Sequence, residues 1–431
     1  MKAKKKVLII TYYWPPAGGP GVQRWLKFSK YLPEFGWEPT VYIPENPSYP
    51  LVDETLVNEV PNNIKIIKRK IWEPYQWAEK LNKKNKKFKA GQFDVGKNQS
   101  WKSKLSIWVR GNFFIPDARV FWVKPSVDFL KKYLEKHHYD VIISTGPPHS
   151  VHLIGLGLKN KFPQLKWVAD FRDPWTEISY YQHLKLTKKS DKKHKLLESL
   201  VFKNADITLA TSYSDADNFQ KKGANAFCIT NGFDTEVQTT SVHQFDKFTL
   251  AYIGVLEQLR NPEILWKSLE ELLVENPELK HNFELKFVGK LDDKILSSFN
   301  ETQLKNVLNY VGYLSHKESV LEMQNSNILL ITNFPKKASV GIIPGKLFEY
   351  LATGNTLLSF GPQGADVEKI LKETQAGKHF DYESQSESIK EFILNKYNDW
   401  KENRNQNNFT NIEKFSRKNL SHQLSELLQS L

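Results

Sequence analysis

Residues 341–358, GIIPGKLFEYLATGNTLL, predict a loop, then the start of a helix, then a buried strand. Pro344 suits the first helical position because its ring fixes φ and it has no N–H to leave unpaired. The N–H groups of Gly345, Lys346 and Leu347 would then be free donors at the positive end of the helix. An anion such as a diphosphate is stabilised at such a helix start.

Two charged side chains extend this interpretation. Lys346 adds a full positive charge at the helix start, and Glu349 follows it by three residues on the same helical face. A carboxylate at Glu349 could accept hydrogen bonds from a ribose diol while the helix start holds phosphates. The alternative is an ordinary helix start with a surface Lys346–Glu349 pair.

Short apolar runs alternate with amphipathic helical patterns along nearly the whole chain. The predicted strands are 6–10, 39–43, 64–68, 140–144, 166–171, 206–211, 227–231, 248–254, 283–289, 308–314, 327–332 and 356–360. The predicted helices are 23–32, 127–136, 149–159, 192–203, 263–273, 318–324, 345–352, 365–373 and 415–431. The alternation predicts an α/β fold of two Rossmann-like, doubly wound parallel-sheet domains. Ligands bind at the carboxyl ends of such strands, so two facing domains would share a central cleft.

The chain length of 431 residues also favours roughly two or three domains. The alternation breaks at the polar stretch 231–248, which we interpret as an interdomain linker. We predict a first domain over 1–235, with a basic and aromatic insertion at about 72–125, and a second domain over 245–405. Residues 406–431 form a terminal helix in this scheme.

Composition excludes several classes of protein. The single cysteine, Cys228, rules out a disulfide framework and a cysteine-based zinc site. The apolar run near the N-terminus is too short for a signal peptide, and no window reaches the roughly 18 apolar residues of a membrane span. We therefore expect a soluble cytoplasmic protein.

The net charge of +13 is unevenly distributed. Residues 79–110 contain ten basic and two acidic side chains, with Trp101 and Trp108 among them. Basic residues mixed with aromatic rings suit an anionic membrane surface, here the inner face of the membrane. Nucleic acid is a less favoured partner, and a solvated loop with inward-packed aromatic residues is the structural alternative.

A glycine-rich loop follows the first predicted strand. Gly18, Gly19 and Gly21 allow close backbone approach to a ligand before a helix. Their spacing is not GxGxxG, which disfavours a dinucleotide-dependent oxidoreductase. Arg260 precedes a helix near Pro262 and is suited to a diphosphate. Gly312 ends a later strand, where exposed backbone could pair with a base.

Two further strand ends carry polar side chains. His149 and His152 follow the strand 140–144, and His149 is the better candidate for a substrate phosphate or hydroxyl. A metal site is disfavoured because no carboxylate accompanies them. Asp170, Arg172 and Asp173 follow the strand 166–171, where carboxylates could bind sugar hydroxyls and a guanidinium could bind an anion. A structural Asp–Arg network is the alternative.

Together these motifs resemble family 4 of the GT-B glycosyltransferases, which are retaining and use nucleotide sugars. The resemblance spans nearly the whole chain through the Gly18–Gly19 loop, TGPPHS, ADFRDPW, NGFD, YIGVL with Arg260, and PGKLFEYLATG. It implies that Glu349 binds the donor ribose, that Arg260 holds the diphosphate, and that Gly18 and Gly19 close over the phosphates. The first acid of the family's E-x7-E motif would fall at Gly341.

A second departure lies beside the YIG strand, where Val255 replaces the usual arginine. We hypothesise that Lys346 supplies the missing charge. The resemblance implies a donor-binding second domain and an acceptor-binding first domain, to which the last helix returns. It also implies transfer without a metal or other cofactor. The predicted catalytic residues are Arg260, Lys346, His149 and Asp170.

The expected partners are a nucleotide-diphosphate sugar and a saccharide or lipid-linked acceptor, in cell-surface polysaccharide synthesis. One alternative is a nucleotide-sugar 2-epimerase of the same fold, which would leave the basic aromatic stretch without a purpose. Another is a non-enzymatic protein that binds membranes or nucleic acid. That alternative leaves the phosphate-binding helix start unexplained.

Overall fold

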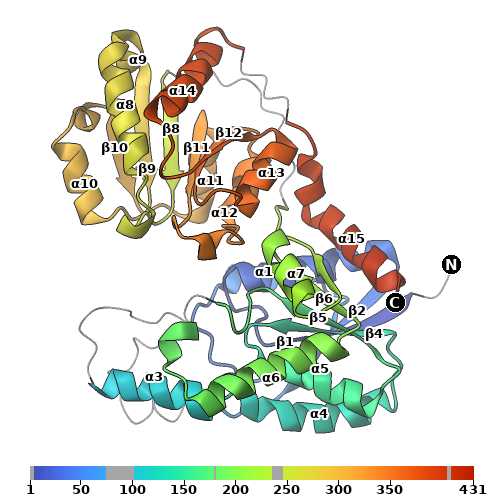
Figure 1. Cartoon of the computed structure of the whole chain (residues 1–431). Helices are drawn as coiled ribbons and strands as arrows, with labels where there is room; N and C mark the ends of the chain where they lie inside the picture. The colour runs from blue at the N-terminus through green and yellow to red at the C-terminus, as the bar shows by residue number, and fades with distance from the viewer. Residues whose placement is uncertain (1–3, 74–100, 179–180, 235–245, 405–408) are drawn as a thin grey trace. The chain divides into compact units, whose positions relative to one another are not determined.

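The computed structural model describes residues 4–73, 101–178, 181–234, 246–404 and 409–431. The chain folds into two compact units, shown in Figure 1. Unit 1 contains Met1–Thr230 together with Arg417–Leu431, and unit 2 contains Asn231–Ser416. The assignment of acceptor and donor binding to separate domains stays a prediction.

Unit 1 is built on a seven-stranded parallel sheet in the order β3-β2-β1-β4-β5-β6-β7. Its strands are β1 Lys5–Thr11, β2 Trp37–Pro44, β3 Lys65–Arg69, β4 Val141–Gly146, β5 Lys166–Phe171, β6 Ile207–Ala210 and β7 Ala226–Cys228. Its helices are α1 Pro20–Tyr31, α3 Trp101–Phe113, α4 Val120–Leu134, α5 Ser150–Lys161, α6 Lys188–Asn204, α7 Tyr213–Lys221 and α15 Arg417–Gln429. Short 3-10 turns are η1 Leu32–Phe35, η2 Glu54–Glu59 and η4 Tyr181–Leu184.

Apolar side chains cover both faces of this sheet. In β1, Leu8 and Ile10 pack into one cluster with side chains of α4, α5 and α6. Val7 and Ile9 point to the opposite face and pack with α1 and α15. A strand buried on both faces needs a continuous apolar run, which is why KVLII was recognisable in the sequence.

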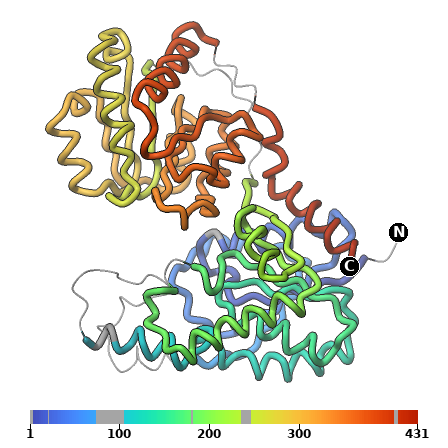
Figure 2. Tube along the Cα trace, in the orientation of Figure 1, coloured from blue at the N-terminus to red at the C-terminus, as the bar shows by residue number. Residues whose placement is uncertain are grey.

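The C-terminal helix α15 packs on α1 within unit 1, although residues 32–416, which include all of unit 2, separate them along the chain. Leu420, Leu424 and Leu428 join Trp25 and Phe28 of α1 in one buried cluster. Figure 2 shows the last residues of the chain running beside the N-terminal part of unit 1.

Unit 2 is built on a six-stranded parallel sheet in the order β10-β9-β8-β11-β12-β13. Its strands are β8 Phe248–Ile253, β9 Phe283–Val288, β10 Leu308–Gly312, β11 Ile328–Thr332, β12 Thr356–Phe360 and β13 Gly377–Phe380. Its helices are α8 Glu263–Glu275, α9 Pro277–Asn282, α10 Asp293–Asn300, α11 His316–Gln324, α12 Lys346–Ala352, α13 Asp366–Thr374 and α14 Ser386–Lys401. Its 3-10 turns are η5 Gln258–Arg260, η6 Gln303–Asn306, η7 Lys337–Ser339 and η8 Ile412–Phe415. The predicted fold class, α/β with two Rossmann-like parallel sheets, is confirmed.

Some elements were not predicted. β13, α3, α9, α10 and α14 are absent from the sequence-based assignment, and half of the predicted insertion at 72–125, residues 74–100, lies outside the described residues. None of the described helices combines the length and apolar character that crossing a membrane requires.

Candidate active site

Two cationic side chains meet at the carboxyl end of β8 in unit 2. Lys346 opens α12, and its Nζ donates to the carbonyl of Ile253 at 3.1 Å. The same Nζ lies 3.6 Å from the centroid of the Tyr252 ring. Arg260 closes η5 and donates from Nη2 to the carbonyl of Val255 at 2.8 Å. The fold therefore brings together the two residues that the sequence assigned to diphosphate binding.

The electrostatics of this pair favour an anionic ligand. Burial lowers the pKa of Lys346 to about 7, and the neighbouring Arg260 charge contributes in the same direction. In the described part of the chain, Lys346 has no carboxylate within ion-pair distance. Arg260 has a long contact of 3.6 Å to the exposed Glu257, and its buried Nε has no acceptor among the described residues. A bound anion would offset this uncompensated positive charge.

The start of α12 differs from the sequence prediction. The helix begins at Lys346, with Gly345 as its N-cap, so Pro344 lies before the helix and not at its first position. The Leu347 N–H donates to the Pro344 carbonyl at 2.9 Å. The prediction of a free Leu347 donor was therefore wrong, because the chain tightens into a turn ahead of the helix.

Glu349 lies one turn into α12 and is half-buried. Among the described residues it makes no ion pair, because the Lys346 ammonium turns toward β8 instead. Its predicted contact with a ribose stays a prediction. At the positions of the two family departures, Gly341 lies in the turn before α12, and the Val255 side chain is 48% exposed.

Three adjacent strands of unit 2 end in glycines with positive φ. Gly254, Gly289 and Gly312 follow or close β8, β9 and β10, with φ of 125°, 107° and 80°. The Gly289 N–H donates to the Gly312 carbonyl at 2.6 Å, and a Cβ on Gly289 would lie 2.3 Å from the Gly254 oxygen. Only glycine fits this close packing. At the carboxyl ends of these three strands, beside Arg260 and Lys346, the chain therefore presents backbone without side chains. The predicted contact between Gly312 and a base requires such exposed backbone.

In unit 1, the glycine loop leads into α1. The Gly18 N–H donates to the carbonyl of Leu51 at 3.0 Å, and Gly19 caps α1 with φ of 102°. A Cβ on Gly21 would lie 1.5 Å from Nη1 of Arg172. Gly21 is therefore required for the Arg172 side chain to pass over the start of α1.

Asp170 is completely buried and accepts three side-chain hydrogen bonds. It accepts from Arg24 Nη2 at 3.0 Å, Trp25 Nε1 at 2.6 Å and Thr145 Oγ1 at 2.8 Å. Arg24 also donates to the carbonyl of Thr230, the last residue of this part of unit 1. An Asp–Arg network was one of our interpretations, but its arginine is Arg24 and not Arg172. This geometry supports positioning of α1 on β5, and a direct catalytic role for Asp170 stays a prediction.

Arg172, Asp173 and His149 lie nearby in unit 1. Arg172 donates from Nε to the Gly146 carbonyl at 3.3 Å and from Nη2 to the Pro147 carbonyl, whereas Asp173 is exposed. His149 is 6% exposed, and neither ring nitrogen has a partner among the described residues.

The environment of His149 determines its charge. Its ring stacks on Trp175 with the centroids 5.1 Å apart and the planes 4° apart. Burial and the nearby His152 and Arg172 hold the pKa of His149 well below its ordinary value. The ring is therefore neutral at physiological pH and could either accept or donate a hydrogen bond to a substrate hydroxyl.

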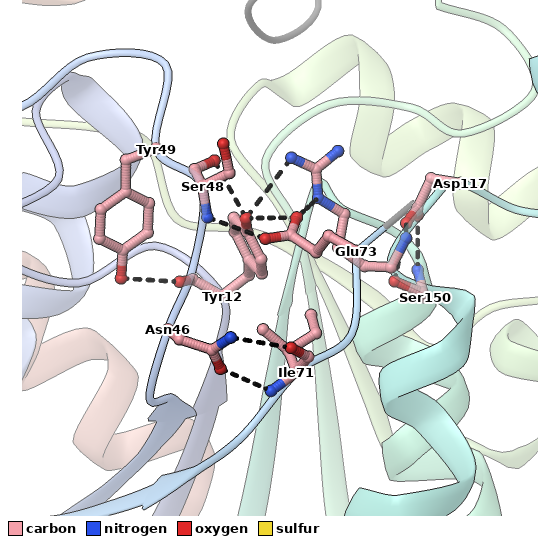
Figure 3. A network of polar contacts seen from close by, with 9 residues as sticks. Tyr12, Asn46, Ser48, Tyr49, Ile71, Glu73, Asp117 and Ser150 are labelled. Atoms are coloured by element: carbon pink, nitrogen blue, oxygen red, sulfur yellow. Dashed lines mark hydrogen bonds and ion pairs between the residues drawn. The ribbon is translucent and has the colours of Figure 1, made fainter. Parts of the chain in front are cut away.

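A polar network that was not predicted from the sequence lies at the carboxyl ends of β1, β2 and β3 (Figure 3). Glu73 accepts from Tyr12 Oη at 2.8 Å and from the Ser48 N–H at 2.8 Å, and it lies 3.1 Å from Arg119 Nε. Nearby, Asp117 accepts from the Ser150 N–H and hydroxyl, both at 2.9 Å. The contributing residues are far apart in sequence, so no local motif marked them.

The described residues contain no group of three or more His, Cys, Asp or Glu side chains arranged to hold a metal ion. The expectation of metal-independent chemistry therefore still rests on the family resemblance.

No protein-family model and no curated protein matches the chain, whereas many solved structures do. The Anabaena protein Alr3699/HepE, solved in complex with UDP-glucose, is 14% identical with a TM-score of 0.55, and the match covers 99% of this chain and 100% of that one. The lipopolysaccharide outer core galactosyltransferase WaaB has the same identity and TM-score, with 99% of both chains covered.

A putative UDP-N-acetylglucosamine 2-epimerase from Listeria monocytogenes is 11% identical with a TM-score of 0.52, over 99% of this chain and 96% of that one. At these identities the likeness concerns the fold. The chain therefore has the GT-B-like α/β fold of these glycosyltransferase structures along its full length.

Proposed function

We propose that this protein is a retaining glycosyltransferase of the family 4 type. It moves a sugar from a nucleotide-diphosphate sugar to a saccharide or lipid-linked acceptor, in the synthesis of a cell-surface polysaccharide on the cytoplasmic side of the membrane. The observation that carries the proposal is the Arg260–Lys346 pair at the end of β8, whose positive charge is largely uncompensated. The UDP-glucose bound to a protein of the same fold supports it.

Five of the predicted site residues have a role in this proposal. As the glycosidic bond to the donor breaks, negative charge builds on the diphosphate, and Arg260 and Lys346 stabilise that charge. Glu349 accepts hydrogen bonds from the ribose, and the backbone at Gly312 contacts the base. In unit 1, the neutral His149 orients a hydroxyl group of the substrate.

A nucleotide-sugar 2-epimerase is the second candidate, because the epimerase from Listeria shares the fold. It would use the same donor diphosphate site but need no acceptor. Incubation with a nucleotide sugar separates the two functions, since an epimerase alters the sugar without any acceptor present.

The first experiment measures thermal stability with UDP, GDP, ADP, CMP and NAD. A ligand that binds the folded state raises the melting temperature according to its concentration relative to its Kd. We expect one nucleoside diphosphate to stabilise the wild type and to stabilise Glu349→Ala and Lys346→Ala much less. Lys305→Ala, at an exposed lysine of η6 before the start of β10, is the control and keeps the full shift.

The competing outcomes are distinct. Equal shifts in the wild type and Glu349→Ala would contradict the ribose role of Glu349. Absence of any shift would contradict the nucleotide-sugar proposal as a whole.

A further inference from the structure

Helix α3 of unit 1 exposes an apolar stripe. Trp101 is 69% exposed, Leu105 50% and Trp108 36%. At 100° per residue these positions fall within an arc of about 60° on one face of the helix. An apolar stripe on a helix normally packs against other protein, and here it faces outward.

An adjoining side of α3 attaches the helix to unit 1. Ile107 and Gly111 are buried there, and a Cβ on Gly111 would lie 2.9 Å from the carbonyl oxygen of Leu184 in η4. Asn112 accepts from the Thr187 N–H at 2.7 Å, which ties the end of α3 to the start of α6. The exposed stripe is therefore held in a fixed orientation by its own packing.

The structure places a group of lysines next to this stripe. The segment from η4 into α6 carries five exposed lysines that form no ion pair among the described residues: Lys185, Lys188, Lys189, Lys192 and Lys193. The acidic side chain within that segment, Asp191, is already paired with Lys195 at 2.8 Å. Figure 1 shows the N-terminal end of α6 close to α3, and these helices are in contact.

More aromatic surface continues from the end of α3. Phe113 is 67% exposed and contacts Trp108, with the ring centroids 5.7 Å apart. Beyond it, Phe121 and Trp72 are 43% and 53% exposed and pack edge to face at 4.7 Å. The exposed apolar area thus extends well past one helix, and a patch of this kind marks an interaction surface.

We propose that α3 and the start of α6 form a docking surface for an anionic lipid bilayer. Tryptophan and phenylalanine rings are stabilised at the boundary between headgroups and acyl chains, and lysines are attracted to anionic headgroups. The stripe supplies the rings and the neighbouring lysines supply the charge. Exposed indole rings beside unpaired lysines are the combination that an anionic bilayer binds, because its headgroups attract the lysines and the boundary with its acyl chains accommodates the rings.

This surface shares no residue with the proposed sugar-transfer site, so the docking proposal does not depend on the proposed function. Of residues 79–110, whose composition predicts membrane contact, residues 79–100 lie outside the described residues. The inference therefore rests on α3 and α6, and the lysines of α6 were not part of the expectation from the sequence.

Co-sedimentation with phosphatidylcholine vesicles, with and without phosphatidylglycerol, tests the proposal. We expect the full chain to bind the phosphatidylglycerol vesicles, less tightly as salt is raised. Trp101→Ala/Trp108→Ala and Lys188→Glu/Lys192→Glu should each reduce binding at least about tenfold. All four side chains are exposed, so both variants should keep the wild-type circular dichroism spectrum and melting temperature.

Matched controls come from unit 2. Tyr313→Ala removes an aromatic ring that is 90% exposed, and Lys336→Glu/Lys337→Glu reverses two exposed lysines, so both should bind like the wild type. Wild-type protein that ignores phosphatidylglycerol vesicles would overturn the proposal, as would α3 or α6 variants that bind them normally. Tight binding of single-stranded DNA in place of vesicles would reassign the surface to nucleic acid.

Discussion

At the scale of single residues, Lys346 links the candidate site to pH. Its folded-state pKa of about 7 lies below the value of about 10.4 of an unfolded lysine. Between these values the unfolded chain binds more protons, so the free energy of unfolding rises with pH. We expect it to rise by about 1–2 kcal/mol more in the wild type than in Lys346→Met between pH 7 and 9. Urea denaturation at each pH measures the difference.

The control for this prediction is Lys336→Met, which replaces an exposed lysine. It should keep the pH dependence of the wild type. Parallel curves for the wild type and Lys346→Met would mean that burial does not lower the pKa of Lys346. The same titration implies that affinity for a nucleoside diphosphate falls as pH rises above about 7, because the free protein then loses the charge that the phosphates need.

From residue types and spacing, the charged residues of the site were easier to predict than the contacts that each residue makes. Arg260 and Lys346 were placed correctly near each other because both follow strands whose carboxyl ends lie at the same edge. The partner of Asp170 was not predictable, because Arg24 is 146 residues away in the sequence. The orphaned nitrogens of His149 likewise depend on how Trp175 packs, which no local pattern encodes.

At the scale of elements, the glycines that end β8, β9 and β10 give a matched pair of substitutions. A methyl group on Gly289 would overlap backbone atoms of Gly254, whereas on Gly312 it would meet no atom within 4 Å. Both positions have positive φ, which costs about 1 kcal/mol for alanine.

We therefore expect Gly289→Ala to lower the free energy of unfolding of unit 2 by at least about 3 kcal/mol, and Gly312→Ala by only about 1 kcal/mol. Chemical denaturation followed by circular dichroism compares them. Equal losses would show that the close approach of β8 and β9 relaxes without cost, and that φ alone explains these glycines.

Elements with strong periodicity were predicted well, and those fixed by tertiary contacts were not. β8 and β11 are buried at every position and β1 from Val7 onward, and each contains a run of four apolar residues: VLII in β1, LAYI in β8 and ILLI in β11. β13 is an edge strand with the sequence GKHF, so its hydrogen bonds to β12 define it rather than its composition. α3 was not predicted because its basic residues are mixed with aromatic ones, so the segment was interpreted as part of the basic and aromatic insertion.

At the scale of the whole molecule, alternation along the chain predicted two parallel sheets but not their strand order. In both sheets the first strand along the chain, β1 or β8, lies in the interior of the sheet. The next two strands add to one side of it, and the remaining strands add to the other side. That order depends on right-handed crossovers and on which helix covers which face. The packing of α15 on unit 1 was expected only from the family resemblance. The amphipathic pattern of this helix does not indicate which surface its apolar face packs against.

The return of α15 makes unit 1 discontinuous, and this leads to a prediction about independent stability. Leu424 is fully buried against the α1 cluster, so Leu424→Ala should destabilise unit 1 by about 2–5 kcal/mol. In hydrogen exchange, we expect amides of β1, β4 and β5 to lose protection while those of β8, β9 and β11 keep theirs. Glu426→Ala, at an exposed position of the same helix, should change neither set. Equal loss of protection in both sheets would show that the two units unfold as one cooperative body, and that α15 stabilises the whole chain.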